Sequence, residues 1–341
     1  MAATIEVAVL GLGRVGASIG MALKRYNSTK NAAQQFRVTG YDLSEVNASQ
    51  AKSMGAFDVQ SRSIFDAVRD KALVVMALPY GDVQQAYRDI GGAVTRGTVI
   101  MDLSPYKAPS LQWAKKSLPD EVFVVGVTPI LNPAYLFDGL DDTTHAAADL
   151  LDKGALLIMP AVDTAPEAVE LISDLGSLID TTIRFADPVE HDGWAAATEG
   201  LPAVAGIAAF YMLMRNGSWR DAQQQGNPNF GRLVHALYDT HADDLRDLLL
   251  NNREGTVRQI DGLIEALHGL RDTLARNDRD ALEAILGETT DAAHLWVIKR
   301  RENKWDKPTT PKIDSTQIAT SIFFGSALGK RLRGDRNNDR K

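Results

Sequence analysis

Three glycines near the start of the chain have the spacing of a turn that holds a phosphate anion. The segment 11–16 reads G-L-G-R-V-G, between an apolar run at 5–10 and a helical pattern at 15–26. In such a turn the first glycine allows the tight bend, the second lets a pyrophosphate approach the backbone, and the third lets the helix pack on the strand. The amino end of the helix then faces the anion. The segment predicts a dinucleotide-binding turn formed by Gly11, Leu12, Gly13, Arg14, Val15 and Gly16.

An acidic residue after the second predicted strand indicates which dinucleotide binds. Asp42 follows the run 37–41, where a carboxylate is expected to hold the ribose hydroxyls of the adenosine half. Its charge would repel a 2′-phosphate, so we expect NAD rather than NADP as the cofactor. The spacing from Gly16 exceeds the usual ~20 residues, and we attribute the excess to a polar insertion at 27–35. The alternative is a solvated aspartate at a strand end.

Further candidate residues follow other predicted strands. The carboxyl ends of parallel strands meet at one edge of a sheet, and ligands of such folds bind there. We therefore expect the following residues to line the site, with Leu78, Pro79 and Ser104 against the cofactor. They are Leu78 and Pro79 after the run 72–78, Ser104 after the run 98–103, Lys107 in the same loop, and Thr128 after the run 122–127.

The order of the predicted elements indicates an α/β fold followed by helices alone. Short apolar runs alternate with helix-compatible segments up to residue 187, which predicts a doubly wound, mostly parallel sheet of Rossmann type over 1–187. Beyond Pro188 only helical periodicity remains, so we expect an all-helical domain over 188–330 and a disordered charged tail over 331–341. The predicted strands are 5–10, 37–41, 72–78, 98–103, 122–127, 155–159 and 181–185.

The helical domain carries the pattern of a dimerisation surface. Five apolar residues recur with spacings of 3, 4, 3 and 4, as in the seam between two packed helices. They form either a core seam within one chain or an interlocking seam between two subunits, and we expect a homodimer. The apolar run 201–214 is too short for a bilayer span of ~20 residues and predicts a buried core helix. The seam residues are Ile260, Leu263, Leu267, Leu270 and Leu274.

Composition narrows the classes of partner and location. With 341 residues, 45% of them hydrophobic and 24% charged, the chain has the composition of a globular protein of about two domains. A formal charge of −7 does not favour nucleic acid or an anionic membrane as partners. There is no cysteine and no secretory signal pattern, so we expect a cytoplasmic protein. His235 and Asp239 share a helix face, but a metal site needs a further ligand, so none is expected.

The motifs together resemble the prephenate and arogenate dehydrogenase family of tyrosine biosynthesis, over about residues 5–300. The resemblance implies an oxidoreductase that passes a hydride from a cyclohexadienyl substrate to NAD with loss of carbon dioxide. It implies catalytic roles for Thr128, His191, Glu199, Arg232 and Lys107. It rests on G-L-G-R-V-G-A-S at 11–18, D-x-x-x-x-K at 102–107, V-V-G-V-T-P at 124–129, E-H-D at 190–192, G-L-P at 200–202, G-R-L at 231–233 and the helical stretch 249–253.

The departures from the family pattern fall on residues that would do the chemistry. Thr128 stands where the family has a histidine that accepts the proton of the substrate hydroxyl, and a threonine hydroxyl is no base near neutral pH. Loss of a general base costs ~10² to 10⁴ in rate. Pro105 replaces the family's serine, and Glu199 begins a stretch that has lost two histidines. His191 is either a structural histidine that bonds Asp192 or a replacement base.

Two residues of the helical domain bear on the substrate. Arg232 matches the arginine that grips a substrate carboxylate in the family, and its alternative role is that of a solvated helix residue. Glu199 either faces solvent or faces a cleft, where it would repel a dicarboxylate and bind an amine such as that of arogenate. Two rival functions stay open: a dehydrogenase of the same fold acting on another hydroxy or amino acid, and a catalytically silent NAD-binding dimer.

Overall fold

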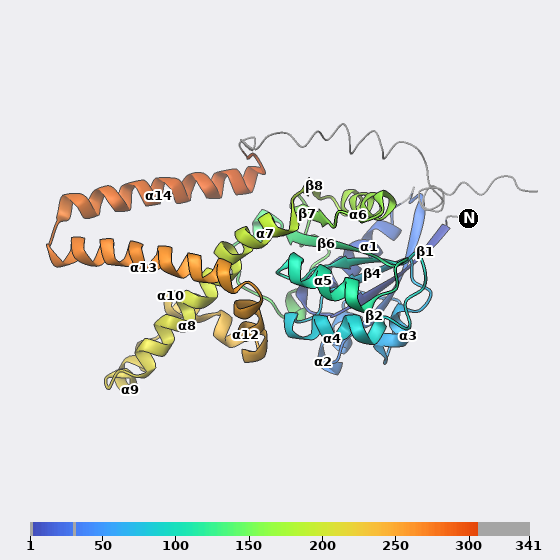
Figure 1. Cartoon of the computed structure of the whole chain (residues 1–341), viewed down its shortest axis with the longest axis horizontal. Helices are drawn as coiled ribbons and strands as arrows, with labels where there is room; N and C mark the ends of the chain where they lie inside the picture. Colours follow the sequence, from blue (N-terminus) through green and yellow to red (C-terminus); the bar gives the residue numbers. More distant parts are fainter. Residues whose placement is uncertain (1–2, 30–31, 306–341) are drawn as a thin grey trace, which may run out of the picture. The chain divides into compact units, whose positions relative to one another are not determined.

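The computed structural model describes residues 3–29 and 32–305 (Figure 1). The chain divides into two compact units, one ending at Asp192 and the other beginning at Gly193, and each is described by itself. The predicted domain boundary lies just before helix α7 (Pro188–Ala195), whereas this division falls within it. The predicted tail 331–341 and the segment 306–330 lie outside the described residues.

The first unit contains one sheet of eight strands in the order β3-β2-β1-β4-β5-β6-β7-β8. All neighbours are parallel except β6 and β7, so the predicted mostly parallel sheet is confirmed. All seven predicted runs form strands, whereas β3 was missed because two residues carry no pattern. The strands are β1 (Ala3–Leu10), β2 (Gln34–Tyr41), β3 (Val59–Gln60), β4 (Leu73–Met76), β5 (Val99–Asp102), β6 (Phe123–Ile130), β7 (Ala155–Pro160) and β8 (Thr182–Phe185).

Helices cover both faces of this sheet (Figure 1). Buried side chains of α1, α2 and α6 form one apolar cluster with alternate residues of the strands, while α4 contacts both α3 and α5. Strands β4 and β5 are buried along their whole length, as a parallel sheet covered on both faces requires. The helices are α1 (Arg14–Asn27), α2 (Glu45–Ser53), α3 (Ile64–Val68), α4 (Tyr80–Ile90), α5 (Lys107–Ser117), η1 (Pro133–Tyr135), η2 (Thr143–His145) and α6 (Pro166–Leu178).

One edge of the sheet gathers the ends of the central strands. The chain turns from β1 towards β2 on one side, and from β4 towards β5 on the other, so the crevice of a doubly wound sheet lies between β1 and β4. Strand β6 runs past the end of β5, because Asp102 pairs with Gly126 and β6 continues to Ile130. Thr128 therefore lies at the same edge as the glycine turn.

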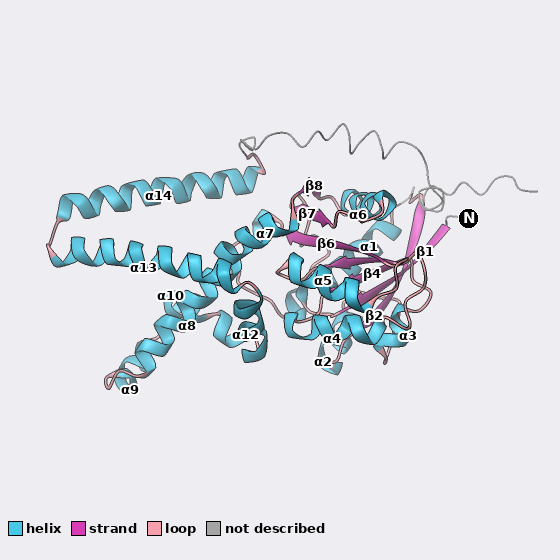
Figure 2. Cartoon of the chain, viewed as in Figure 1, coloured by secondary structure: helices cyan, strands magenta, loops and turns pink. Residues whose placement is uncertain are grey.

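The second unit consists of helices alone in the part that the structure describes (Figure 2). This confirms the predicted all-helical region for 193–305. The segment after α7 forms a π-helical turn, η3, which continues into α8. The elements are η3 (Ala196–Gly200), α8 (Leu201–Met214), α9 (Trp219–Ala222), η4 (Gln223–Gln225), α10 (Pro228–Val234), α11 (Ala236–Asp239), α12 (Ala242–Asn251), α13 (Arg253–Ala275) and α14 (Arg279–Glu302).

The second unit buries little apolar surface within one chain. The prediction that 201–214 is a buried core helix is wrong for the single chain, because only Ala203 and Gly206 of α8 are buried. Hydropathy records how apolar a segment is and does not record what covers it. The seam predicted on α13 is also open, with Leu267 52% and Leu274 57% exposed. The buried apolar residues of the described second unit are Ala195, Ala196, Ala203 and Leu245.

Candidate functional site

The glycine turn after β1 is built so that only glycine fits at two of its positions. Gly11 has φ +89°, and a Cβ there would lie 2.2 Å from the carbonyl oxygen of Ala77. A Cβ at Gly16 would lie 1.9 Å from the carbonyl oxygen of Gly11. The absence of a side chain at Gly11 and Gly16 therefore lets the start of α1 pack closely on the end of β1 and on the loop after β4, as the motif predicts.

Gly13 differs from the other two glycines because it faces open space. A Cβ at Gly13 would meet no atom within 4 Å among the described residues. Gly13 is also the N-cap of α1, where no described side chain caps the helix and the first turn holds no acidic residue. The amino end of a 14-residue helix therefore stays open to an anion. This geometry fits the pyrophosphate of a dinucleotide.

Asp42 lies beside this turn and is held by two backbone donors. Its Oδ2 accepts a hydrogen bond from the Leu12 amide at 2.7 Å, and its Oδ1 accepts one from the Ser44 amide at 2.7 Å. The carboxylate thus joins the end of β2 to the glycine turn. It is half-buried, so it can still meet a ligand at this edge.

The side chain of Arg14 points away from the open end of α1. It is 4% exposed, and its Nη1 and Nη2 donate to the two carboxylate oxygens of Asp138 at 2.9 and 2.6 Å. The guanidinium also lies 5.3 Å from the ring centre of Tyr135. The hydrogen bond with Arg14 holds the pKa of Asp138 below its usual value. The expected contact of the Arg14 side chain with the cofactor is therefore corrected: the side chain anchors the loop after β6, and only its backbone faces the turn.

A buried polar cluster lies at the end of β5. Asp102 has no exposed surface; its Oδ2 accepts from the hydroxyl of Tyr87 at 3.0 Å and from Ser110, and its Oδ1 accepts from the hydroxyl of Ser104 at 2.5 Å. Burial, reinforced by the charge of Asp102, raises the pKa of Tyr87 well above its usual value, so the phenol remains a donor. Ser104 is 3% exposed. Its predicted contact with the cofactor is corrected, because its hydroxyl serves this cluster.

Lys107 is fully buried and ties strand ends together. Its ammonium donates to the backbone carbonyls of Ser104, Asp102 at 3.3 Å and Val127 at 2.8 Å. These bonds connect the loop after β5 to β6 just before Thr128. The prediction of a catalytic Lys107 is therefore corrected to a positioning role, because a side chain with no exposed surface does not touch a substrate.

The structure brings Thr128, His191 and Asp192 into one hydrogen-bonded chain. Thr128 Oγ1 lies 2.8 Å from Nε2 of His191, and Nδ1 of His191 lies 3.1 Å from Oδ1 of Asp192. Asp192 also accepts from the amides of Lys107 at 2.7 Å and Ala108 at 2.9 Å, which are the first residues of α5. The His191–Asp192 bond was foreseen, but the cap on α5 and the contact with Thr128 were not, because both depend on tertiary packing.

Leu78 and Pro79 follow β4 as predicted, half-buried and exposed respectively. Val15, the remaining residue of the turn, is also half-buried. All three belong to the edge where the glycine turn opens, so their expected contact with the cofactor stays a prediction.

The other predicted site residues belong to the second unit. Glu199 is exposed on the π-helical turn η3, and Arg232 is exposed on α10, where its Nη1 donates to Asn229 at 3.2 Å. Helix α10 sits close to α8, because a Cβ at Gly206 would lie 2.4 Å from the carbonyl oxygen of Leu233. Glycine at 206 therefore fixes the helix that carries Arg232.

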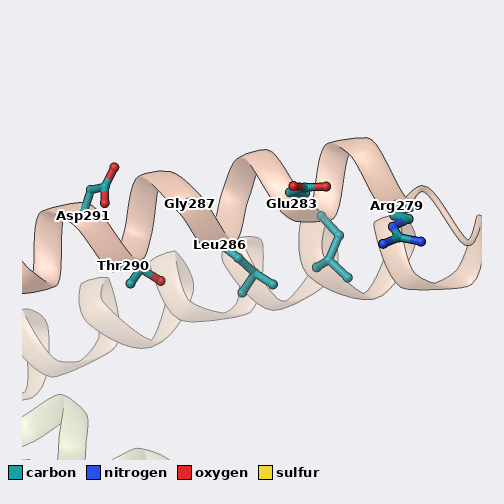
Figure 3. Close-up of a pocket in the computed structure, with 7 residues that line it drawn as sticks. Arg279, Glu283, Leu286, Gly287, Thr290 and Asp291 are labelled. Atoms are coloured by element: carbon teal, nitrogen blue, oxygen red, sulfur yellow. The ribbon is translucent and has the colours of Figure 1, made fainter.

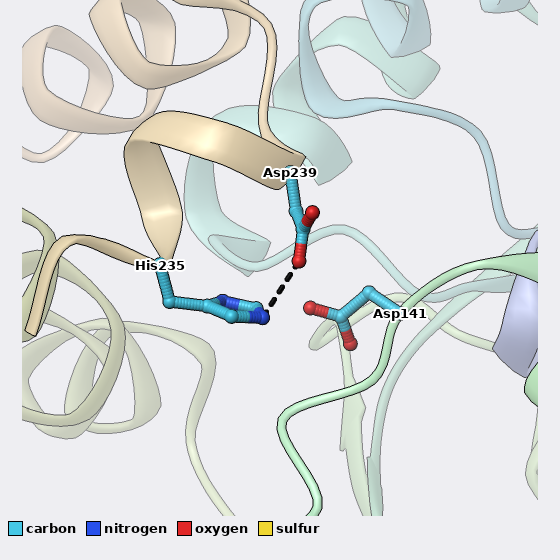
Figure 4. Close-up of side chains that lie close together, drawn as sticks. All are labelled: Asp141, His235 and Asp239. Carbon is cyan, nitrogen blue, oxygen red and sulfur yellow. Dashed lines mark ion pairs between the residues drawn. The ribbon is translucent and has the colours of Figure 1, made fainter. Parts of the chain in front are cut away.

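His235 and Asp239, the pair considered for a metal site, contact each other. Nε2 of His235 lies 2.6 Å from Oδ2 of Asp239, one helical turn away (Figure 4). His241, which follows this pair in the chain, accepts from the amide of Asp243 at 3.3 Å and caps α12. The i, i+4 spacing thus brings the imidazole and the carboxylate together on one side of the helix, as such spacing commonly does.

Comparison with known proteins identifies the family. A family model described as the nucleotide-binding domain of prephenate dehydrogenase matches residues 26–183. Over these residues the chain is similar to the prephenate dehydrogenase family. It is 24% identical to the cyclohexadienyl dehydrogenase of Zymomonas mobilis over 292 residues, which cover 81% of this chain and 91% of that enzyme. It is 22% identical to the prephenate dehydrogenase of Bacillus subtilis over 281 residues, covering 81% of this chain and 72% of that enzyme.

A solved structure shows that the likeness extends to the fold. Prephenate dehydrogenase from A. aeolicus, in complex with hydroxyphenyl propionate and NAD+, matches with a TM-score of 0.70 at 18% identity, over 85% of this chain and 97% of that one. The predictions of this family and of a dehydrogenase with a dinucleotide-binding fold are confirmed. At these identities the relatives do not determine the substrate.

Proposed function

We propose that this protein oxidises a cyclohexadienyl hydroxy acid, prephenate or arogenate, with NAD as the hydride acceptor and with loss of carbon dioxide. The observation that carries the proposal is that the open Gly13 turn and the Thr128 hydroxyl lie at the same edge of the sheet in the first unit. The turn offers a place for the pyrophosphate, and the hydroxyl offers a contact for the group that is oxidised.

The residues of this edge divide the work of binding and proton transfer. Gly13 and the amino end of α1 bind the pyrophosphate, and Asp42 accepts from the ribose hydroxyls. When bound, NAD accepts a hydride from the carbon that bears the substrate hydroxyl. Thr128 orients that hydroxyl, and Lys107 positions the end of β6 by donating a hydrogen bond to the carbonyl of Val127. Most of the rate then comes from positioning, which is worth ~10⁵ to 10⁸ M in effective concentration when the geometry is good.

Within the second unit, two charged side chains suit a carboxylate and an amine. Arg232 presents a planar cation that suits a carboxylate, and its helix is fixed by the close approach at Gly206. Glu199 presents an anion on η3, which favours an amine over a second carboxylate. We therefore expect arogenate to be preferred to prephenate and Glu199→Gln to narrow that preference.

A second copy of the chain completes the helical unit. A unit whose buried apolar residues are three alanines and one leucine has too small a core to be stable alone. Apolar side chains stay exposed on α13 and α14 instead, among them Ile264, Leu267 and Trp296. A shallow groove lined by Leu282 and Leu286 is formed by α14 alone, so it is an open helix face and not an enclosed pocket (Figure 3). These faces support the homodimer predicted from the seam on α13.

The same argument applies to the helical segment Pro188–Met214. By length and composition alone it could cross a membrane, and 17% of its most apolar window is buried. We propose that a second copy covers it, because exposed apolar faces continue on other helices of the same unit. If a second copy covers this segment, it does not enter a membrane, and we propose the cytoplasmic location that was expected from the sequence.

A matrix of substrates and cofactors tests the proposed activity. Purified protein is assayed with prephenate and with arogenate, each with NAD and with NADP, by the absorbance of the reduced nicotinamide. We expect turnover with NAD and at least tenfold lower kcat/KM with NADP. Arg232→Ala is expected to raise KM about 30-fold or more, the loss of a charge-assisted pair of roughly 2 kcal/mol. Binding of NAD without turnover of either compound would reject the proposed activity and favour a silent binding protein.

A further inference from the structure

We propose that Thr128, His191 and Asp192 form a proton relay that replaces a base in direct contact with the substrate. Thr128 accepts the proton of the substrate hydroxyl and at the same time passes its own proton to His191. This inference rests on the proposed function, because the proton that moves is the one on the carbinol group.

The burial of the three residues decides which one can meet a substrate. The side chain of His191 is 6% exposed and that of Asp192 is 10% exposed, so neither reaches a ligand. Thr128 is half-buried at the end of β6 and lies at the ligand-binding edge of the sheet. A proton that is to reach His191 from a substrate therefore has to pass through the Thr128 hydroxyl, 2.8 Å from Nε2.

The network also sets the direction of the bonds. An ionised carboxylate only accepts, so the contact of Asp192 with Nδ1 assigns the proton of a neutral His191 to Nδ1. Nε2 then carries the lone pair, and the Thr128 hydroxyl is the donor in the second bond. The same logic governs serine–histidine–aspartate sites, where the carboxylate fixes the tautomer and stabilises the imidazolium that forms.

Asp192 is held in place by the amino end of α5. Both of its oxygens accept backbone amides there, at 2.7 and 2.9 Å, and the helix dipole favours its negative charge. Other titratable residues of these segments include Lys107 at the start of α5, Asp187 just before α7 and Glu190 on α7. The Lys107 ammonium is directed to Val127, and the Asp187 carboxylate accepts the amides of Val189 and Glu190. Asp192 is thus the charge that the imidazole contacts.

The relay accepts a proton from the substrate and later returns it to the product. As the hydride leaves the carbinol carbon for NAD, the substrate O–H bond breaks, its electron pair forms the ring carbonyl, and the proton bonds to Thr128 Oγ1. The Oγ1–H bond breaks in the same step and its proton bonds to Nε2, so Thr128 remains a hydroxyl and His191 becomes an imidazolium. Loss of carbon dioxide then moves an electron pair into the ring, and the ring oxygen recovers the proton through Thr128. The overall reaction releases no proton, and the relay ends as it began.

Four variants test the relay by kinetics. Thr128→Val keeps the shape of the side chain without the hydroxyl, and we expect it to lower kcat at least ~100-fold, as loss of general base catalysis does. Thr128→Ser keeps the hydroxyl and should retain activity within about fivefold of wild type. His191→Gln should lower kcat as Thr128→Val does. His145→Gln is the matched control, because His145 also bonds an aspartate, Asp142 at 2.8 Å, but is exposed.

Nitrogen-15 NMR of the histidines tests the same relay without activity. We expect His191 to show a protonated Nδ1 and an unprotonated Nε2, and Thr128→Val to shift only Nε2. Normal kcat in His191→Gln would overturn the relay while leaving the proposed activity intact. If the wild-type protein turns over neither compound, the proposed activity fails, and the NMR result alone decides the relay: the Nδ1–H tautomer supports it, whereas two exchanging tautomers overturn it.

Discussion

Replacing Gly13 with alanine separates cofactor binding from folding. Gly13 has φ −63° and ψ −172°, which alanine adopts freely, and a methyl group there meets no atom within 4 Å. Alanine restricts the unfolded chain more than glycine does, so we expect the free energy of unfolding to rise by about 0.4 to 1 kcal/mol. The same methyl group occupies the space that the pyrophosphate needs. We expect the dissociation constant for NAD to rise at least tenfold, about 1.4 kcal/mol of binding free energy.

Calorimetric titration with NAD and urea unfolding without it measure the two effects. Gly92→Ala is the matched control, because its Cβ also meets open space but lies in the turn after α4, outside the cofactor turn. It should leave NAD affinity unchanged. Gly16→Ala should lose both affinity and stability, since its Cβ would lie 1.9 Å from a carbonyl oxygen. Unchanged NAD affinity in Gly13→Ala would refute the assignment of this turn to the pyrophosphate.

Three further outcomes are expected. Asp42→Asn should reduce the preference for NAD over NADP in titrations and lower the melting temperature, because an amide NH₂ replaces one of two oxygens that accept backbone N–H groups; an unchanged cofactor preference would contradict the role of Asp42. Asp138→Asn should lower the free energy of unfolding at pH 7 by about 2 kcal/mol. Arg14 lowers the pKa of Asp138 in the folded state. The difference in free energy of unfolding between wild type and variant should therefore be full above the ordinary aspartate pKa of about 4 and should shrink as the pH falls below it. A difference that stays constant from pH 7 to pH 3 would exclude the ion pair as its source. Leu267→Asp should convert a dimer into a species of 37.1 kDa in light scattering, whereas a wild-type protein that is already monomeric would reject the dimer.

Local patterns were sufficient to predict the sheet. Six of the seven predicted strands are short apolar runs that are largely buried, whereas β8 is exposed at both of its ends. The glycine turn follows β1 as its motif requires. The antiparallel pairing of β6 with β7 was not predicted, because direction depends on the path of the loop 131–154 and not on the strands themselves. The exposure of α8 was also missed, since periodicity does not tell which molecule covers an apolar face.

Residue types predicted the place of the site better than the role of each residue. Thr128 and His191 were both identified, but their contact joins residues that are far apart in the sequence, at the end of β6 and on α7. Arg14, Ser104 and Lys107 were assigned to ligands, yet all three are buried and bonded within the protein. A sequence motif does not show whether a polar side chain faces the ligand or the core. Only the burial of each side chain distinguishes the two.

The central claim is that hydride transfer in this protein is coupled to loss of carbon dioxide from a cyclohexadienyl ring. The most direct test measures both products in one reaction, with prephenate or arogenate as substrate and NAD in excess. NADH is followed by absorbance, and carbon dioxide is trapped and quantified from substrate labelled in the ring carboxylate. We expect equal amounts of NADH and carbon dioxide at every time point. NADH formed without carbon dioxide, or no NADH with either substrate, would contradict it.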